Sequence, residues 1–169
     1  VVAANGTTAI YGYYNGDKTT TSPDDVWNDN FVLVEHFASA EIGTDSTGTN
    51  TGTLTGNLTT KDSTMGTAAV FTGSQKVTYE PLLSGEGAFT ISAVVDTEDP
   101  GSYVGIATRD KNGGTKDGDT YFLGINGGSG QFLGRFYGTK ANKDITTPYS
   151  AGYHVLTLSY TGSKLMLYI

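Results

Sequence analysis

The sequence contains no cysteine, and only 2 of its 169 residues are histidine. These absences exclude disulfide-rich scaffolds and thiolate metal sites, and they argue against a zinc site. Basic residues are also scarce, because 10 Lys and Arg stand against 17 Asp and Glu, for a formal net charge of -7. An acidic surface repels phosphate groups, so we expect no nucleic-acid binding and no binding to anionic membrane surfaces.

Long apolar runs are missing as well. None approaches the roughly 20 residues that a membrane helix needs, so we expect no membrane insertion. The chain starts at Val1 rather than Met, which favours a mature or excised piece of a longer protein. The few Lys and Arg and the many uncharged polar residues lead us to expect an extracellular or surface-exposed location, which could be secreted, cell-envelope or virion.

Glycine and threonine dominate what is present, with 24 Gly in the chain and Thr in nearly every block of ten. Threonine suits half-exposed strands and glycine suits the turns between them, so the composition predicts an all-β protein. The clearest strand pattern covers residues 88–96, where one face would carry Phe89, Ile91, Ala93 and Val95 and the other Ala88, Thr90, Ser92 and Val94.

The same period-two pattern predicts about ten strands and no helix longer than a turn or two. Two antiparallel sheets packed face to face are the simplest way to bury so many half-apolar strands. We expect hairpins around residues 72–74, 127–130 and 161–163. The predicted strands cover residues 8–14, 31–37, 68–72, 76–80, 88–96, 103–109, 119–126, 131–137, 153–160 and 164–169.

Four stretches carry a resemblance to a known family: residues 89–93 (FTISA), 118–125 (GDTYFLGI), 152–160 (GYHVLTLSY) and 162–169 (GSKLMLYI). They resemble the laminin-G-like, or concanavalin A-like, jelly rolls of bacterial and archaeal surface proteins. The resemblance implies an all-β fold, a two-sheet antiparallel jelly-roll sandwich. Residues 45–48 and 52–54 are similar to the first loop of that family.

Residues 10–16 (IYGYYNG) and 25–27 (DVW) resemble the end of a small uncharacterised domain that often precedes such jelly rolls. We therefore interpret residues 1–28 as an N-terminal strand and connector. Residues 29–169 would form a laminin-G-like jelly roll without the closing strands that the family usually has.

Three explanations for the missing strands remain open. The remainder was cleaved or left untraced, residues 8–14 fold back and fill the vacancy, or a strand from a neighbouring subunit fills it. The third would give a structural subunit of a filament, virion or surface layer, assembled from copies of itself. The candidate assembly residues are Ile10, Tyr11, Tyr13, Leu165, Leu167 and Ile169.

No catalytic constellation is recognisable in the sequence. Enzymes on the fold that the resemblance implies place their acids on one strand as Glu-x-Asp-x-x-Glu, and nothing here matches. His36 and His154 both fall in predicted strands, and no nucleophile elbow precedes a helix. We therefore expect a non-enzyme.

Calcium is the one cofactor that the sequence suggests. Asp110, Asp117 and Asp119 lie with several glycines in one loop, and hard oxygen ligands of this kind suit Ca²⁺. The alternative is an exposed hairpin loop with Asp-Gly and Asn-Gly turns. Asp45 is a second candidate, because the loop after it helps to form an ion site in related folds.

Aromatic and planar polar residues could form a carbohydrate site, since sugars bind on aromatic faces flanked by hydrogen-bonding groups. The candidates are Tyr103, Arg109, Tyr121, Arg135 and Tyr137. Each tyrosine could equally be a residue at the edge of the core. We expect a non-catalytic extracellular binding or adhesion module for glycans or surface polymers, with the structural subunit as the alternative. Two triplets, at Asn5 and Asn57, also fit the pattern of N-glycosylation.

Overall fold

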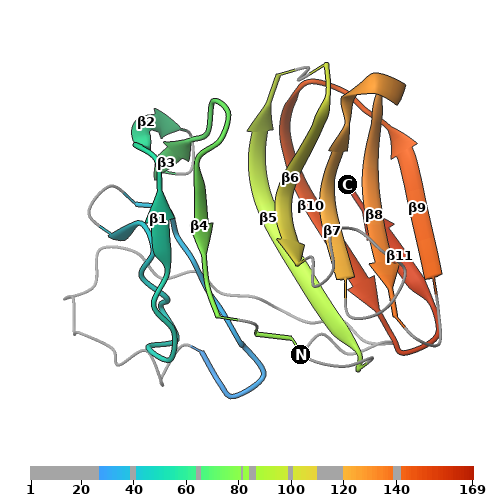
Figure 1. Cartoon of the computed structure of the whole chain (residues 1–169), viewed down its shortest axis with the longest axis horizontal. Coiled ribbons are helices and arrows are strands. Elements are labelled where there is room, and N and C mark those ends of the chain that lie inside the picture. Colours follow the sequence, from blue (N-terminus) through green and yellow to red (C-terminus); the bar gives the residue numbers. More distant parts are fainter. Residues whose placement is uncertain are drawn as a thin grey trace, which may run out of the picture. The chain divides into compact units, whose positions relative to one another are not determined.

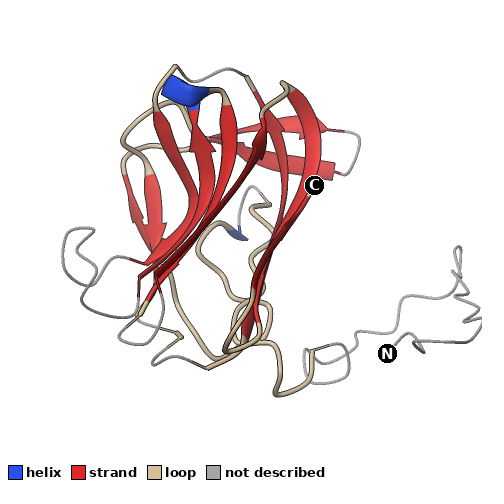
Figure 2. Cartoon of the chain, turned by 90° about the vertical axis from the view of Figure 1, so that its right-hand side faces the viewer, coloured by secondary structure: helices blue, strands red, loops and turns tan. Residues whose placement is uncertain are grey.

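The computed structural model describes residues 27–38, 41–63, 66–80, 82–83, 87–98, 101–109, 120–138 and 142–169. This part of the chain consists almost entirely of strands and loops, and every strand pairing is antiparallel (Figure 2). The all-β prediction is therefore confirmed. The chain divides into two compact units, Val1–Tyr79 and Glu80–Ile169, and we describe each by itself.

Two sheets make up the C-terminal unit (Figure 1). The four-stranded sheet has the order β6-β7-β8-β9, and the three-stranded sheet has the order β11-β10-β5. The strands are β5 (Phe89–Thr97), β6 (Tyr103–Arg109), β7 (Thr120–Asn126), β8 (Gln131–Tyr137), β9 (Asn142–Pro148), β10 (Gly152–Tyr160) and β11 (Leu165–Tyr168).

The inward faces of these two sheets form one hydrophobic core. Every second residue of β5 is partly buried, and Phe89, Ile91 and Val95 pack against this core, so the alternation predicted for residues 88–96 is confirmed. Rings from the two sheets meet directly, because Phe136 of β8 stacks on Tyr160 of β10 with 4.2 Å between ring centroids. The fully buried members are Leu123, Phe132, Leu156 and Leu158, and each contributes about 1.5–3 kcal/mol by burial.

Tight turns set the register of the predicted C-terminal hairpins. In the β10–β11 turn, the amide of Thr161 donates to the carbonyl of Lys164 over 3.1 Å. A short 3-10 turn, η2 (Gly127–Ser129), joins β7 to β8, and Gly130 closes it with a φ of 62°. Both hairpins are confirmed, whereas the polar strand β9 was not predicted.

The described part of the N-terminal unit contains two small two-stranded sheets. Strand β1 (Thr53–Thr55) pairs with β4 (Lys76–Thr78), and β2 (Thr59–Ser63) pairs with β3 (Gly66–Val70). The prediction of a hairpin around residues 72–74 is therefore wrong, because β3 and β4 belong to different sheets. Loop residues 72–75 separate them and are held by a hydrogen bond from Thr72 to the Gln75 side chain.

The predicted strand at residues 31–37 is also wrong. Only Glu35 forms a bridge there, to Asp45, and Phe31 and Val32 are exposed rather than buried. The run (FVLVEHF) has no period-two alternation, so neither face of a strand could be buried cleanly. Trp27 instead packs edge-on against Phe31, with 5.0 Å between ring centroids.

Candidate functional site

The outer face of the four-stranded sheet carries a row of aromatic and polar side chains. We call it the β6–β9 outer face. The strand register sets Phe122, Arg135 and Asp144 side by side across β7, β8 and β9. A parallel row four residues away contains Tyr103, Asn126 and Gln131. Leu133 lies between the rows and is buried, with only 2% of its surface exposed.

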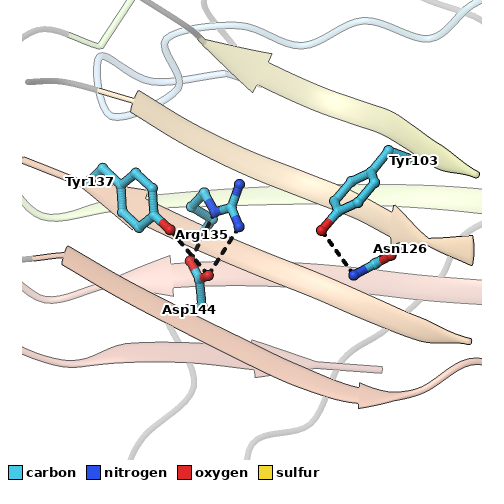
Figure 3. A network of polar contacts seen from close by, with 5 residues as sticks. All are labelled: Tyr103, Asn126, Arg135, Tyr137 and Asp144. Atoms are coloured by element: carbon cyan, nitrogen blue, oxygen red, sulfur yellow. Dashed lines mark hydrogen bonds and ion pairs between the residues drawn. The ribbon is translucent and has the colours of Figure 1, made fainter. Parts of the chain in front are cut away.

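Arg135 and Asp144 form the centre of this face (Figure 3). The guanidinium Nε donates to one carboxylate oxygen over 2.9 Å, and Nη2 donates to the other over 3.0 Å. The Tyr137 hydroxyl donates to Asp144 over 3.2 Å, and the guanidinium lies 4.9 Å from the centre of the Tyr137 ring. Such a two-point pair fixes the plane of both groups.

The opposite charges of Arg135 and Asp144 attract one another. The hydrogen bonds to Asp144 raise the pKa of Arg135 above its ordinary value. Burial raises the pKa of the Tyr137 hydroxyl, and the carboxylate of Asp144 adds to this effect, while Arg135 opposes it. The face therefore presents a neutral tyrosine beside a fixed ion pair whose charges cancel.

A second polar pair lies at the other end of the same face. The Asn126 amide donates to the Tyr103 hydroxyl over 2.9 Å, and the Tyr103 ring is 58% exposed (Figure 3). The Tyr103 ring also meets Phe122 edge-on, with 6.3 Å between centroids. Asn126 and Phe122 therefore both fix the orientation of the exposed Tyr103 ring.

Two glycines allow the Phe122 ring to lie close to the sheet. A Cβ atom on Gly124 would come within 2.7 Å of the Phe122 ring, and one on Gly105 would come within 3.5 Å of it. Both glycines lie on the outer face in register with one another. The absence of their side chains makes room for the aromatic ring, which is a common use of glycine in strands.

A pocket of about 400 Å³ lies beside this network, where β6 ends and β7 begins. Its lining includes Thr108, Arg109, Tyr121, Phe122 and Arg135. Three of the five predicted carbohydrate-binding residues therefore line it. Two of its lining residues, Arg109 and Thr120, flank residues 110–119 in the sequence, and those residues lie outside the described part of the chain.

The five predicted carbohydrate-binding residues divide between the two faces of the sheet. Tyr103 and Arg109 are six residues apart, an even spacing that places both on one face of a regular strand. The pairing of β6 with β7 shifts between Gly105 and Ala107, so one extra residue reverses the face. Arg109 therefore pairs with Tyr121, which packs against the core, whereas Tyr103, Arg135 and Tyr137 lie outside.

Sequence reasoning missed Asp144, Asn126 and Phe122. Strand β9 (NKDITTP) has only one large apolar residue, so no alternation marked it as a strand or set its register. Without the register, the contact between Arg135 and Asp144 could not be found. The sequence contains the turn dipeptide Asn126-Gly127, but this dipeptide does not show where the Asn126 side chain points.

Three of the four predicted calcium ligands, Asp110, Asp117 and Asp119, lie outside the described residues, and calcium there stays a prediction. Within the described ranges, no group of three or more His, Cys, Asp or Glu residues could hold a metal ion. Asp45 is described, and its two oxygens accept hydrogen bonds from Val34 and from the loop that follows Asp45.

Asp45 organises the loop that follows it in the N-terminal unit. One carboxylate oxygen accepts the Val34 amide at 2.9 Å and the Thr47 amide at 3.0 Å. The other accepts the Thr47 hydroxyl at 2.5 Å and the Asn50 side-chain amide at 2.7 Å. Burial would raise the pKa of Asp45, but these hydrogen bonds outweigh burial and hold the pKa far below its usual value.

Nearby, Glu35 accepts hydrogen bonds from the amides of Phe37 and Gly43, each at 2.9 Å, and from the Tyr79 hydroxyl. Burial raises the pKa of Tyr79, and the Glu35 carboxylate raises it further. These contacts tie Tyr79, at the end of this unit, to Glu35 and Gly43. Both acids thus serve the local structure.

Comparison of the chain with known protein families, with curated proteins and with solved structures finds no match. Among the described residues, no helix has the length and apolar character needed to cross a membrane.

Proposed function

We propose that the C-terminal unit is a glycan-binding module with a jelly-roll sandwich of the laminin-G or concanavalin A type. It would act on the outside of a cell or particle, as an adhesion or surface-binding domain. The observation that carries the proposal is the β6–β9 outer face, where a fixed Arg135–Asp144 pair lies between the half-buried ring of Tyr137 and the exposed ring of Tyr103 (Figure 3).

This arrangement suits a sugar better than an apolar ligand. A pyranose ring can stack on an aromatic surface such as Tyr103, whose hydroxyl is already oriented by Asn126. Its hydroxyl groups can donate to the remaining lone pairs of Asp144 and accept from the Nη1 of Arg135. Because the pair is already formed, little side-chain entropy would be lost on binding.

We also propose that the module does not catalyse a reaction. Glycoside hydrolysis requires two opposed carboxyl groups, about 5 to 9.5 Å apart. Among the described residues of the β6–β9 outer face, Asp144 is the one acid, and Arg135 and Tyr137 already engage it. This supports a role in binding, with the ligand leaving unchanged.

The substitution Arg135→Gln tests the proposal. It removes the cation that pairs with Asp144, so retention on a bound polysaccharide should fall roughly 10- to 100-fold. The measurement is affinity retention on a panel of cellulose, chitin, xylan and mannan. Tyr103→Ala should weaken binding about tenfold by removing the stacking surface.

Lys164→Gln is the matched control for Arg135→Gln. It removes one positive charge from the exposed turn before β11, on the other sheet, and should leave retention unchanged. Equal losses in both variants would show that net charge alone drives retention. If no polysaccharide on the panel retains the unaltered chain, the proposal fails.

A second candidate function is assembly through the edge of β11. Within the described residues, β11 pairs with β10 alone, so its other edge carries no strand. The strand (LMLY) contains no charge, proline or bulge, the features that usually protect an edge. Of the candidate assembly residues, Leu165 is buried and Ile169 exposed, while Ile10, Tyr11 and Tyr13 lie outside the described residues.

Light scattering distinguishes this candidate from the first. Assembly by strand addition predicts particles that grow with concentration, whereas a glycan-binding module predicts a monomer. Met166→Lys places a charge on β11 and should disperse such an assembly. Val94→Lys, on the opposite edge strand β5, should have no effect on particle size. A monomer at every concentration would rule out assembly.

A further inference from the structure

The turn between β1 and β2 contains the triplet Asn57-Leu58-Thr59. Asparagine is followed two positions later by Ser or Thr at two places in the sequence, and Pro intervenes at neither. The other, Asn5-Gly6-Thr7, lies outside the described residues. In N-linked glycosylation the Asn side-chain nitrogen receives the sugar, and the hydroxyl two residues later is required for recognition.

The Asn57 side chain is accessible in the folded chain. Both Asn57 and Thr59 are exposed. The β1–β4 pairing ends at Thr55 and the β2–β3 pairing begins at Thr59, so Asn57 belongs to neither ladder. No side-chain hydrogen bond joins Asn57 to another described residue, and its amide is free to react.

The backbone around Asn57 also suits an acceptor. Gly56 has a φ of 80°, which turns the chain out of β1 just before the acceptor. Strands β2 and β3 form a two-stranded sheet whose residues are mostly exposed. Such a pair is marginally stable by itself, so local opening to fit a transferase site costs little.

We propose that Asn57 is an acceptor for an N-linked glycan when the chain is exported. The Asn57 side-chain nitrogen attacks the anomeric carbon of an oligosaccharide carried on a polyisoprenyl diphosphate. A C–N bond forms, the anomeric C–O bond breaks, polyisoprenyl diphosphate leaves, and the nitrogen loses one proton. This site lies in the N-terminal unit and does not depend on the β6–β9 outer face.

Mass spectrometry of the secreted chain tests the proposal. The chain would carry Asn5→Gln, so that any glycan is assigned to Asn57, and would be secreted from yeast behind a cleavable leader. The peptide that contains Asn57 should gain the mass of an oligosaccharide in most molecules. An endoglycosidase should remove that mass.

Two neighbouring threonines provide the controls. Thr59→Ala destroys the triplet and should abolish the added mass, whereas Thr60→Ala, one residue outside it, should leave the added mass in place. Thr59→Ser should retain part of the modification. An unmodified Asn57 peptide would overturn the proposal, provided that a co-secreted reporter is glycosylated in the same cells. Modification that survives Thr59→Ala would overturn it too.

Discussion

Replacing Leu156 with Ala should destabilise the C-terminal unit by about 3–4 kcal/mol. Leu156 lies in β10 with 0% of its surface exposed, and it packs in the core between the two sheets. Truncation removes buried methyl groups and leaves a cavity, because a close-packed core collapses only partly. Urea unfolding followed by the near-ultraviolet circular dichroism of the tyrosines measures the loss.

Val155→Ala is the matched control on the same strand. Val155 points to the opposite face and is 55% exposed, so its truncation should cost less than about 1 kcal/mol. Comparing the loss of unfolding free energy in Leu156→Ala with that in Val155→Ala therefore shows which face of β10 is buried. Equal losses would mean that the two sheets do not enclose the side chains assigned to the core.

Replacing Asp45 with Ala should destabilise the N-terminal unit by about 3 kcal/mol, because hydrogen bonds to a buried charged acceptor are strong. Asp45 is 4% exposed, and its removal leaves the Val34 and Thr47 amides without their acceptor. Trp27 is the one tryptophan of the chain and lies in this unit, so its fluorescence reports the unfolding. Asp62→Ala removes the same charge from an exposed strand position and should cost little.

The contribution of Asp45 should also depend on pH. Its pKa is lowered in the folded state, so the unfolded state binds the proton more readily. The stabilisation is complete above the unfolded value of about 3.9 and is lost as the pH falls below it. The free-energy difference between the unaltered chain and Asp45→Ala should therefore shrink in acid. A difference that stays constant down to low pH would show that the carboxylate charge does not hold the loop.

Strands with clear alternation and a tight turn could be predicted from the sequence. The pattern of Phe89, Ile91 and Val95 requires one buried face, and the Gly162-Ser163 turn leaves one register for β10 and β11. The strand predicted at residues 31–37 was wrong. A run of consecutive apolar residues does not show whether the rest of the fold provides surfaces to cover both of its faces. The polar edge strand β9 was missed for the opposite reason, since one inward apolar residue, Ile145, suffices there.

The candidate site was only partly predictable, because it depends on register rather than on residue type. Arg135 and Tyr137 are two residues apart on one strand, so their shared face follows from the strand period. The bulge after Gly105 cannot be read from the sequence, and it separates Arg109 from Tyr103. The contact between Arg135 and Asp144 joins two strands across a loop, so only the observed pairing reveals it.

Nuclear magnetic resonance mapping on the C-terminal unit within the whole chain would test the binding proposal most directly. The chain would be titrated with a short oligosaccharide of the polysaccharide that retains it. Glycan binding on the β6–β9 outer face predicts that the largest shifts occur at Tyr103, Asn126, Arg135 and Asp144, and that Arg135→Gln abolishes them. Shifts confined to Val94 and Val155 on the outer face of the other sheet would contradict the proposal.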